Sequence, residues 1–228
     1  MPESWKDKQG KVSAFYERLD SASEQEVAIN GFQLRILYEQ PRDGFSYGCT
    51  PADVIRILRR VVHLSPILPD IIAFRQPTRK QQKQKTVWGR FLFHAELGKH
   101  KGTAIILEAQ ELGSILKWPK RMTVEDREEY DRLVSDGHEF VEKKRHFQAE
   151  LTEVAVRNTK LYRTLLHEIG HLVHYHQSVH NQQTALDESL EIARDLHFAI
   201  PNSEREIFAH SFSDKLSRAI RIDSEIYD

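Results

Sequence analysis

The sequence predicts an α+β fold, with a small mixed sheet and one helix in the first half and a helical second half. Two observations lead to this prediction. Short runs in the first half alternate apolar and polar residues or are wholly apolar, as strands do, whereas apolar residues in the second half recur at helical spacing. The 228 residues, 39% of them hydrophobic, suffice for one core, and we expect a cleft between the two halves.

The composition excludes several classes of protein. Lys and Arg number 33 and Asp and Glu 34, so no net charge draws the chain to nucleic acid or acidic membranes. The N-terminus has no apolar signal-peptide core, and no apolar run reaches the roughly 20 residues that span a bilayer. Cys49 is the only cysteine, which fits a reducing compartment. We expect a cytoplasmic protein without membrane partners; the sequence does not indicate its oligomeric state.

The first half is expected to form a strand–helix–strand–strand–strand unit after a polar segment, residues 1–28, that contains one short helix. The helix of the unit begins at Thr50, a good N-cap that is followed by Pro51 and Asp53, and it ends near Ser65. The strands follow from alternation or from continuous apolar runs. They are predicted at residues 32–38, 71–74, 87–93 and 103–109.

A basic stretch, residues 76–85, lies between two of these strands. It carries four positive charges without interleaved aromatic residues, so we interpret it as an exposed loop. A nucleic-acid contact through residues 79–85 is the less favoured alternative.

The second half is predicted to be helical. A strongly charged helix begins at Thr123 with a capping arrangement and continues to about Glu153. Three further helices are predicted at about 160–177, 185–197 and 203–218. Together these elements define one domain, residues 29–228. It comprises a sheet subdomain (29–115), a charged helical insertion (116–158) and a helical subdomain (159–228).

The run His167-Glu168-Ile169-Gly170-His171 indicates metal chemistry. Two histidines four residues apart lie one turn apart on one face of a helix, so both imidazoles can bind the same ion. In this HExxH arrangement zinc lowers the pKa of its water and Glu168 takes the proton. The alternative is an ordinary amphipathic helix with surface histidines. A stripe of apolar residues favours a helix half-buried beside a cleft: Leu165, Leu166, Ile169, Leu172 and Val173.

A catalytic zinc site needs a third protein ligand. The metzincin spacing requires a histidine where this chain has Gln177, so that class is excluded. His174 lies one turn further along the same straight helix and cannot close a tetrahedron. An acid from a later helix remains, and Glu191 has a spacing similar to that of thermolysin-like enzymes. Three acids qualify by position: Glu188, Glu191 and Glu206.

The stretch Glu204-Arg205-Glu206-Ile207-Phe208-Ala209-His210-Ser211-Phe212 resembles the E-F-F-A-x-x-F signature of the glutamate helix in compact gluzincins, among them the catalytic domain of anthrax lethal factor. The resemblance covers residues 160–218. It implies a zincin-like fold, zinc as the cofactor and Glu206 as the third ligand. The small Ala209 would let this helix approach the motif helix closely. His210 stands where relatives often carry an acid that orients a ligand histidine.

The same resemblance implies a zinc metallopeptidase, an endopeptidase acting on a peptide or protein substrate. Glu168 would serve as general base, and His197 is the candidate oxyanion donor, with His174 and Tyr175 as further candidates. An edge strand pairs with the substrate backbone in this fold, and residues 103–110 are the best candidate. Two alternatives stay open: a zinc-stabilised regulatory or interaction protein that cleaves nothing, and a nucleic-acid-associated protein.

Overall fold

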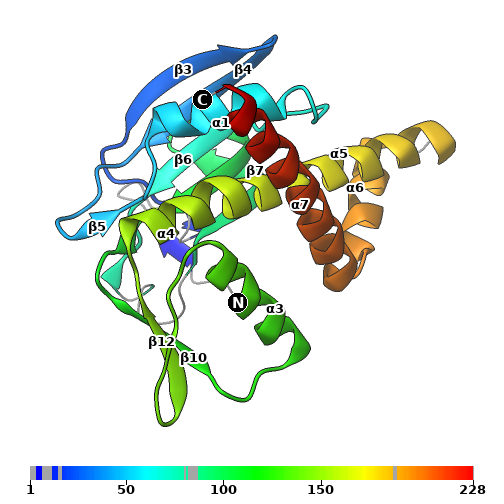
Figure 1. The fold of residues 1–228 in the computed structure, drawn as a ribbon. Helices are drawn as coiled ribbons and strands as arrows, with labels where there is room; N and C mark the ends of the chain where they lie inside the picture. Colours follow the sequence, from blue (N-terminus) through cyan, green and yellow to red (C-terminus); the bar gives the residue numbers. More distant parts are fainter. Residues whose placement is uncertain are drawn as a thin grey trace.

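The computed structural model describes residues 4–6, 12–14, 17–79, 81, 87–186 and 189–227, and the fold is mixed α+β as expected. Its centre is a five-stranded sheet in the order β3-β4-β6-β8-β7 (Figure 1). The three inner strands are mutually parallel, and both outer strands are antiparallel to their neighbours. The strands are β3 (Ser23–Ile29), β4 (Phe32–Tyr38), β6 (Ile71–Arg75), β7 (Gly89–Leu97) and β8 (His100–Glu108).

The sequence predicted four of these strands and missed the first. Strand β3 lies largely within the segment expected to be polar and helical, so the predicted boundary at residue 29 cuts through a strand. Asn30 and Gly31, with φ of 46° and 87°, form the turn between β3 and β4. An Asn-Gly pair with two positive φ angles favours a tight hairpin, and this signal outweighs the polar composition of the strand. Further upstream, β1 (Ser4–Lys6) pairs with β2 (Val12–Ala14).

Helix α1 (Pro51–Val61) begins as the sequence predicted. The Asp53 N–H donates to Thr50 Oγ1 at 3.2 Å, and the Thr50 N–H donates to Asp53 Oδ2 at 2.9 Å, which completes a capping box. The Asp53 carboxylate also accepts hydrogen bonds from both terminal nitrogens of Arg157, each at 2.8 Å. The buried face of the helix packs in the main core, and a bidentate ion pair links its first turn to the helical half.

The segment predicted as one long charged helix is instead a small α/β insertion. Helix α3 (Val124–Ser135) has the expected cap at Thr123, but it ends before Gly137, whose φ of 95° is left-handed. Phe140 lies in a loop and Phe147 on a strand, and both pack against Tyr130 of α3 at ring distances of 4.6 and 5.4 Å. A three-stranded sheet completes the insertion: β10 (Ile115–Pro119), β11 (Val141–Glu142) and β12 (His146–Glu150). Strands β5 (Phe45–Ser46) and β9 (Gln110–Glu111) pair nearby.

A continuous helical path follows the insertion and carries the motif. It consists of α4 (Glu153–Asn158), the π-helix η2 (Thr159–Thr164) and α5 (Leu165–Leu186). Helices α6 (Leu190–Ala199) and α7 (Asn202–Tyr227) complete the chain. The three helices predicted after the insertion are confirmed; the first and third are longer than predicted, and the second is shorter because it begins at Leu190. In the part of the chain that the structure describes, no helix is long and apolar enough to cross a membrane.

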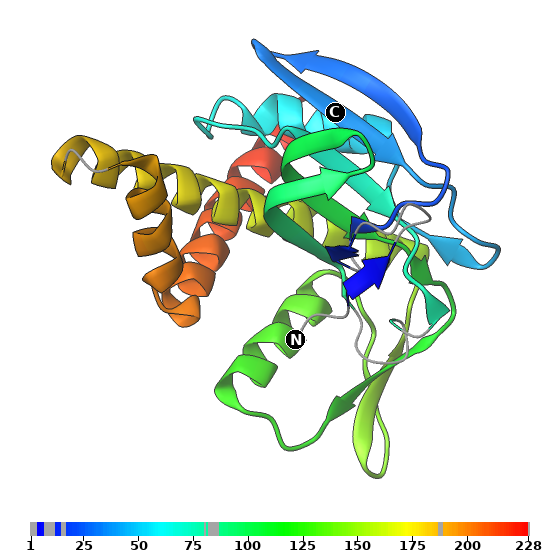
Figure 2. The same cartoon turned by 180° about the vertical axis from the view of Figure 1, so that it is seen from behind.

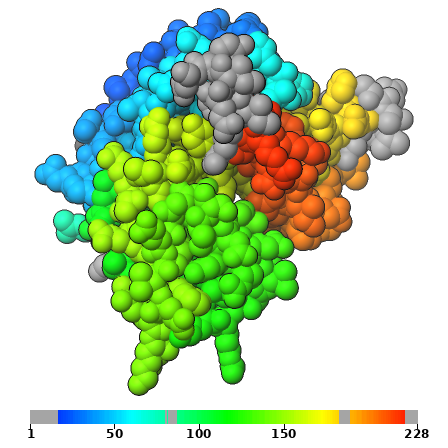
Figure 3. Space-filling model, in the orientation of Figure 1, coloured from blue at the N-terminus to red at the C-terminus, as the bar shows by residue number. Residues whose placement is uncertain are grey.

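The main core lies between the sheet and helices α1, α5 and α7. Helix α5 runs along the sheet, and α7 crosses α5 (Figure 1). The β7–β8 hairpin is seen best from behind (Figure 2). The insertion forms the lower part of the face drawn in Figure 3, next to α7. The crossing of α5 and α7, the edge of the sheet and the insertion together surround the motif.

Candidate metal centre

The two motif histidines face one another across one turn of α5. Their Nε2 atoms are 3.1 Å apart, and both imidazoles are partly exposed on the same side of the helix. The predicted apolar stripe on the other side is fully buried: Leu165, Leu166, Ile169, Leu172 and Val173 are all 0% exposed. The helix is therefore fixed in the core by one face and presents the histidines on the other.

Helix α7 brings Glu206 to these histidines. Glu206 Oε2 lies 3.2 Å from His167 Nε2, and Oε1 lies 3.6 Å from His171 Nε2. Hydrogen bonds from the imidazole of His167, which has the larger effect, and from that of His171 hold the pKa of the Glu206 carboxyl well below its usual range. Of the two other acids considered, Glu191 is exposed on α6 and Glu188 lies outside the described residues.

A close helix crossing makes this meeting possible. A Cβ atom built on Gly170 would lie 2.8 Å from the Ala209 Cα and 2.9 Å from the Ala209 carbonyl oxygen. Such distances are shorter than real Cβ contacts, so a larger residue at Gly170 would push α7 away. The expectation that small Ala209 lets the helices approach is confirmed, and Gly170 within the motif is the second half of the contact.

The three donors fit the dimensions of a zinc site. With zinc–nitrogen distances of about 2.0–2.1 Å, ligand atoms of a tetrahedron lie roughly 3.3–3.4 Å from each other. The two Nε2 atoms are 3.1 Å apart, His167 Nε2 is 3.2 Å from Glu206 Oε2, and His171 Nε2 is 3.6 Å from the other oxygen, Oε1. Two imidazoles and a carboxylate are also a common ligand set for catalytic zinc. Residues His167, His171 and Glu206 could therefore hold the ion.

His210 is a fourth donor at the same place. It follows Glu206 by one turn of α7, and its ring centroid lies 4.4 Å from that of His167. One donor atom from each of His167, Glu206 and His210 falls within 4.8 Å of the others. The orienting role considered for His210 is not seen, because His167 Nδ1 is buried without a hydrogen-bond partner among the described residues.

The side chain of Glu168, on the same helix as the two histidines, lies next to the edge strand β7. Its carboxylate is 8% exposed and accepts a hydrogen bond from the backbone N–H of Phe91 in β7. Burial raises the pKa of Glu168, and the charges of His167 and His171 oppose that shift. A carboxylate held by one backbone donor beside the ligands has a fixed position from which to exchange a proton.

His197 is not brought to the metal ligands. It is 1% exposed on α6 and packs against Phe93, Tyr175 and His174 at ring distances of 5.6, 5.0 and 5.3 Å. Burial lowers its pKa to about 4. Among the described residues it lines neither cavity at the centre, so the structure gives it a packing position. His174 stacks on Phe208 in the same aromatic cluster.

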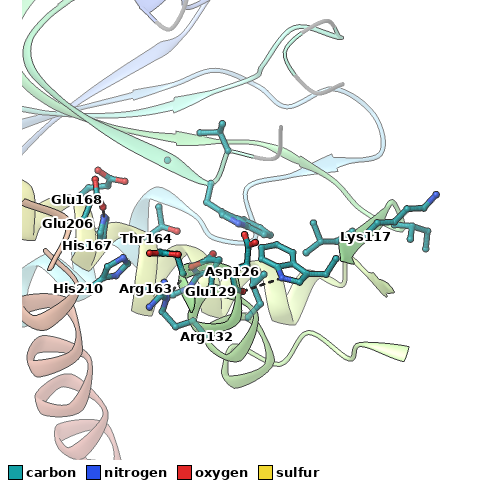
Figure 4. A pocket seen from close by; sticks show the side chains of 18 residues that line it. Lys117, Asp126, Glu129, Arg132, Arg163, Thr164, His167, Glu168, Glu206 and His210 are labelled. Carbon is teal, nitrogen blue, oxygen red and sulfur yellow. Dashed lines mark hydrogen bonds and ion pairs between the residues drawn. The ribbon is translucent and has the colours of Figure 1, made fainter. Parts of the chain in front are cut away.

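Two cavities meet at the ligands. The insertion cavity, about 970 Å³, runs from His167, Glu168, Glu206 and His210 at one end to Lys117 at the other (Figure 4). The edge cavity, about 390 Å³, extends the other way between β7 and the start of α7. Its lining is Gly89, Arg90, Phe91, Phe93, His167, Glu168, His171, Asn202, Arg205 and Glu206.

The strand along these cavities is β7 and not β8. The prediction that residues 103–110 form the edge is wrong, because β8 lies between β6 and β7. The chain returns by a hairpin at Gly98, and β7 pairs on the outer side of β8. A Cβ on Gly89 would meet Thr164 Cγ2 at 2.7 Å, so glycine lets this edge lie directly against the π-helix.

Lys160, in the π-helix, is a residue that sequence reasoning missed. Its side chain is fully buried, lies over the Trp88 ring, and donates to the carbonyl oxygens of Trp88 and Glu108. Burial lowers its pKa to about 7. Since Trp88 directly precedes β7, Lys160 fixes the edge strand to the helix that carries the motif. A lysine in a helical run gives no sequence signal of burial.

Comparison of the chain with protein families, with curated proteins and with solved structures returned no match.

Proposed function

We propose that this chain is a zinc-dependent peptidase with a zincin-like arrangement of its motif helix, glutamate helix and edge strand. His167, His171 and Glu206 would hold the ion, and Glu168 would act as general base. The observation that carries the proposal is that the two oxygens of Glu206 on α7 lie 3.2 and 3.6 Å from two imidazoles of α5 that are 3.1 Å apart, with the buried Glu168 beside them. The resemblance of residues 160–218 to gluzincins supports the same reading.

The chemistry divides between the ion and the chain. Zinc, when bound, supplies a Lewis acid that polarises a carbonyl and acidifies water. Glu168 takes the proton of the attacking water and returns it to the leaving amine, so one carboxylate serves both halves of the reaction. The Phe91 N–H keeps that carboxylate facing the ligands. The edge and insertion cavities receive the two sides of the substrate.

The substrate backbone has a strand to pair with. The Glu108 N–H donates to the Trp88 carbonyl at 3.1 Å, so these residues form a hydrogen-bonded pair of the antiparallel ladder. Gly89 and Phe91 are one residue out of phase and direct their backbone polar groups away from β8. Because the Phe91 N–H is used by Glu168, the carbonyl groups of Gly89 and Phe91 remain as acceptors for an added peptide strand.

A non-catalytic zinc protein is the second candidate, and His210 is the observation that favours it. A catalytic site keeps one position open, whereas four protein ligands close it. His210 lies near enough to be the fourth ligand. The two readings differ in whether the loaded protein turns over substrate.

The test is cleavage of a peptide library by the zinc-loaded protein, with new N-termini identified by mass spectrometry. We expect cleavage that a chelator abolishes and added zinc restores. A protein that holds one zinc per chain and yields no new termini would contradict the peptidase and leave the closed, non-catalytic site.

A further inference from the structure

The edge cavity contains a cation without an acidic partner. Arg205 lies near the start of α7, and it lines the edge cavity together with His171 and Phe93. Its Nη2 donates to Asn202 Oδ1 at 3.3 Å, and its Nε is buried with no hydrogen-bond partner among the residues that the structure describes. In the part of the chain that the structure describes, no carboxylate lies within 4 Å of its guanidinium.

Other arginines around the centre lie against carboxylates. Arg163 is 2.6 Å from Asp136 and 2.7 Å from Glu129, and Arg90 is 2.9 Å from Glu108. A half-buried charge is normally paired, because leaving water without a partner costs free energy. Arg205 therefore differs from its neighbours in a way that an incoming anion would correct.

The acids of the same cavity are already engaged. Glu206 faces the two imidazoles, and Glu168 accepts the Phe91 N–H. Neither can neutralise Arg205 without leaving the position on which the proposed reaction depends. The fork of a guanidinium matches a carboxylate, which it can bind through two parallel hydrogen bonds.

We propose that the edge cavity is a carboxylate-binding subsite in which Arg205 selects substrates. The proposal rests on the proposed peptidase function and names its specificity. The carboxylate belongs to an acidic side chain of the substrate or to its C-terminus. Phe91 and Phe93 also line the cavity, so part of its wall is apolar, and an ion pair is stronger beside an apolar wall than in bulk water.

The first experiment measures binding and needs no turnover. Two hydroxamate probes of equal length, one ending in a carboxylate and one in the neutral amide, are titrated into the zinc-loaded protein by calorimetry. We expect the carboxylate probe to bind roughly tenfold to a hundredfold more tightly, as for a charge-assisted hydrogen bond. Arg205→Gln should abolish the difference, and Arg205→Lys should keep part of it.

Arg194→Gln is the matched control. Arg194 lies on the neighbouring helix α6 and lines neither cavity; it is also half-buried, and its Nε has no hydrogen-bond partner in the described part of the chain. The control should leave the ratio of the two affinities unchanged. Equal affinities of both probes for the unaltered protein overturn the subsite and leave the zinc centre intact. If neither probe binds, the zinc centre fails and the subsite fails with it.

The second experiment identifies the source of the carboxylate. Three peptides that share a sequence are compared: one with an internal Glu, one with Gln at that position, and one with Gln and a free C-terminus placed to reach the cavity. A higher kcat/KM for the Glu peptide, lost in Arg205→Gln, assigns an acidic side chain. A preference for the free C-terminus assigns the terminal group, and equal rates for all three overturn the proposal.

Discussion

At the scale of single residues, the third ligand decides whether the motif is a metal site. Two imidazoles on one helix leave the ion incompletely held, and among the described residues only the carboxylate of Glu206 reaches both of them. Glu206→Ala should therefore lower zinc affinity by at least tenfold, since it removes a coordinating charge. Glu191→Ala, an exposed acid on α6, is the matched control and should bind zinc as the unaltered protein does. Competition with a chelator ranks the variants, and a larger loss for Glu191→Ala would refute the assignment.

The residues of the centre were predictable to different degrees. His167, Glu168 and His171 follow from local spacing, which a helix converts directly into a shared face. Glu206 could be identified only from the resemblance of its helix to the glutamate helix of gluzincins, because the rest of α5 and all of α6 lie between it and the motif in the sequence. The prediction placed His197 at the metal centre, whereas the structure places it in the contact between α6 and Phe93. No local sequence pattern encodes that contact.

At the scale of elements, the crossing of α5 and α7 holds the centre together. Alanine in place of a helical glycine ordinarily stabilises a helix by about 0.5–1 kcal/mol. Gly170→Ala should instead destabilise the protein by about 1–3 kcal/mol, because the new Cβ meets the backbone of Ala209. Urea unfolding measures the sign. Gln177→Ala on the exposed face of α5 is the control without a clash, and stabilisation by Gly170→Ala would show that the helices do not touch here.

The elements also show where sequence patterns stop being sufficient. Capping boxes at Thr50 and Thr123 fixed two helix starts correctly, because a cap is a local hydrogen-bond pattern. The end of α3 and the strands after it were missed, since the apolar residues from Phe140 onward fit a helix face as well as a sheet. The identity of the edge strand was wrong because strand order depends on nonlocal pairing.

At the scale of the whole molecule, the Asp53–Arg157 pair joins the sheet half to the helical half. Arg157 lowers the pKa of Asp53, so the pair contributes stability that is present above the unfolded pKa of about 4 and is lost as the pH falls below it. In the presence of a chelator, Asp53→Asn should lower the free energy of unfolding at pH 7 by about 1–3 kcal/mol. Between about pH 5 and pH 2 the stability of this variant should fall less steeply than that of the unaltered protein.

The matched control for this pair is Asp126→Asn. Asp126 completes the capping box of α3 in the same way but is only partly buried and has no arginine partner among the described residues. It should change stability by less than about 1 kcal/mol. Equal pH profiles for Asp53→Asn and the unaltered protein would show that the two halves are held together by other contacts.

The whole assembly of sheet edge, ligand helices and base has one consequence that can be measured directly. Cleavage of the best peptide from a library is compared between zinc-loaded protein and Glu168→Gln, with zinc content measured in both. The amide keeps the shape of the side chain but cannot take the proton, so we expect full zinc and a rate lower by roughly 10²–10⁴-fold. Equal rates would show that Glu168 is not the base, and no cleavage by the unaltered, fully zinc-loaded protein would contradict the proposed peptidase.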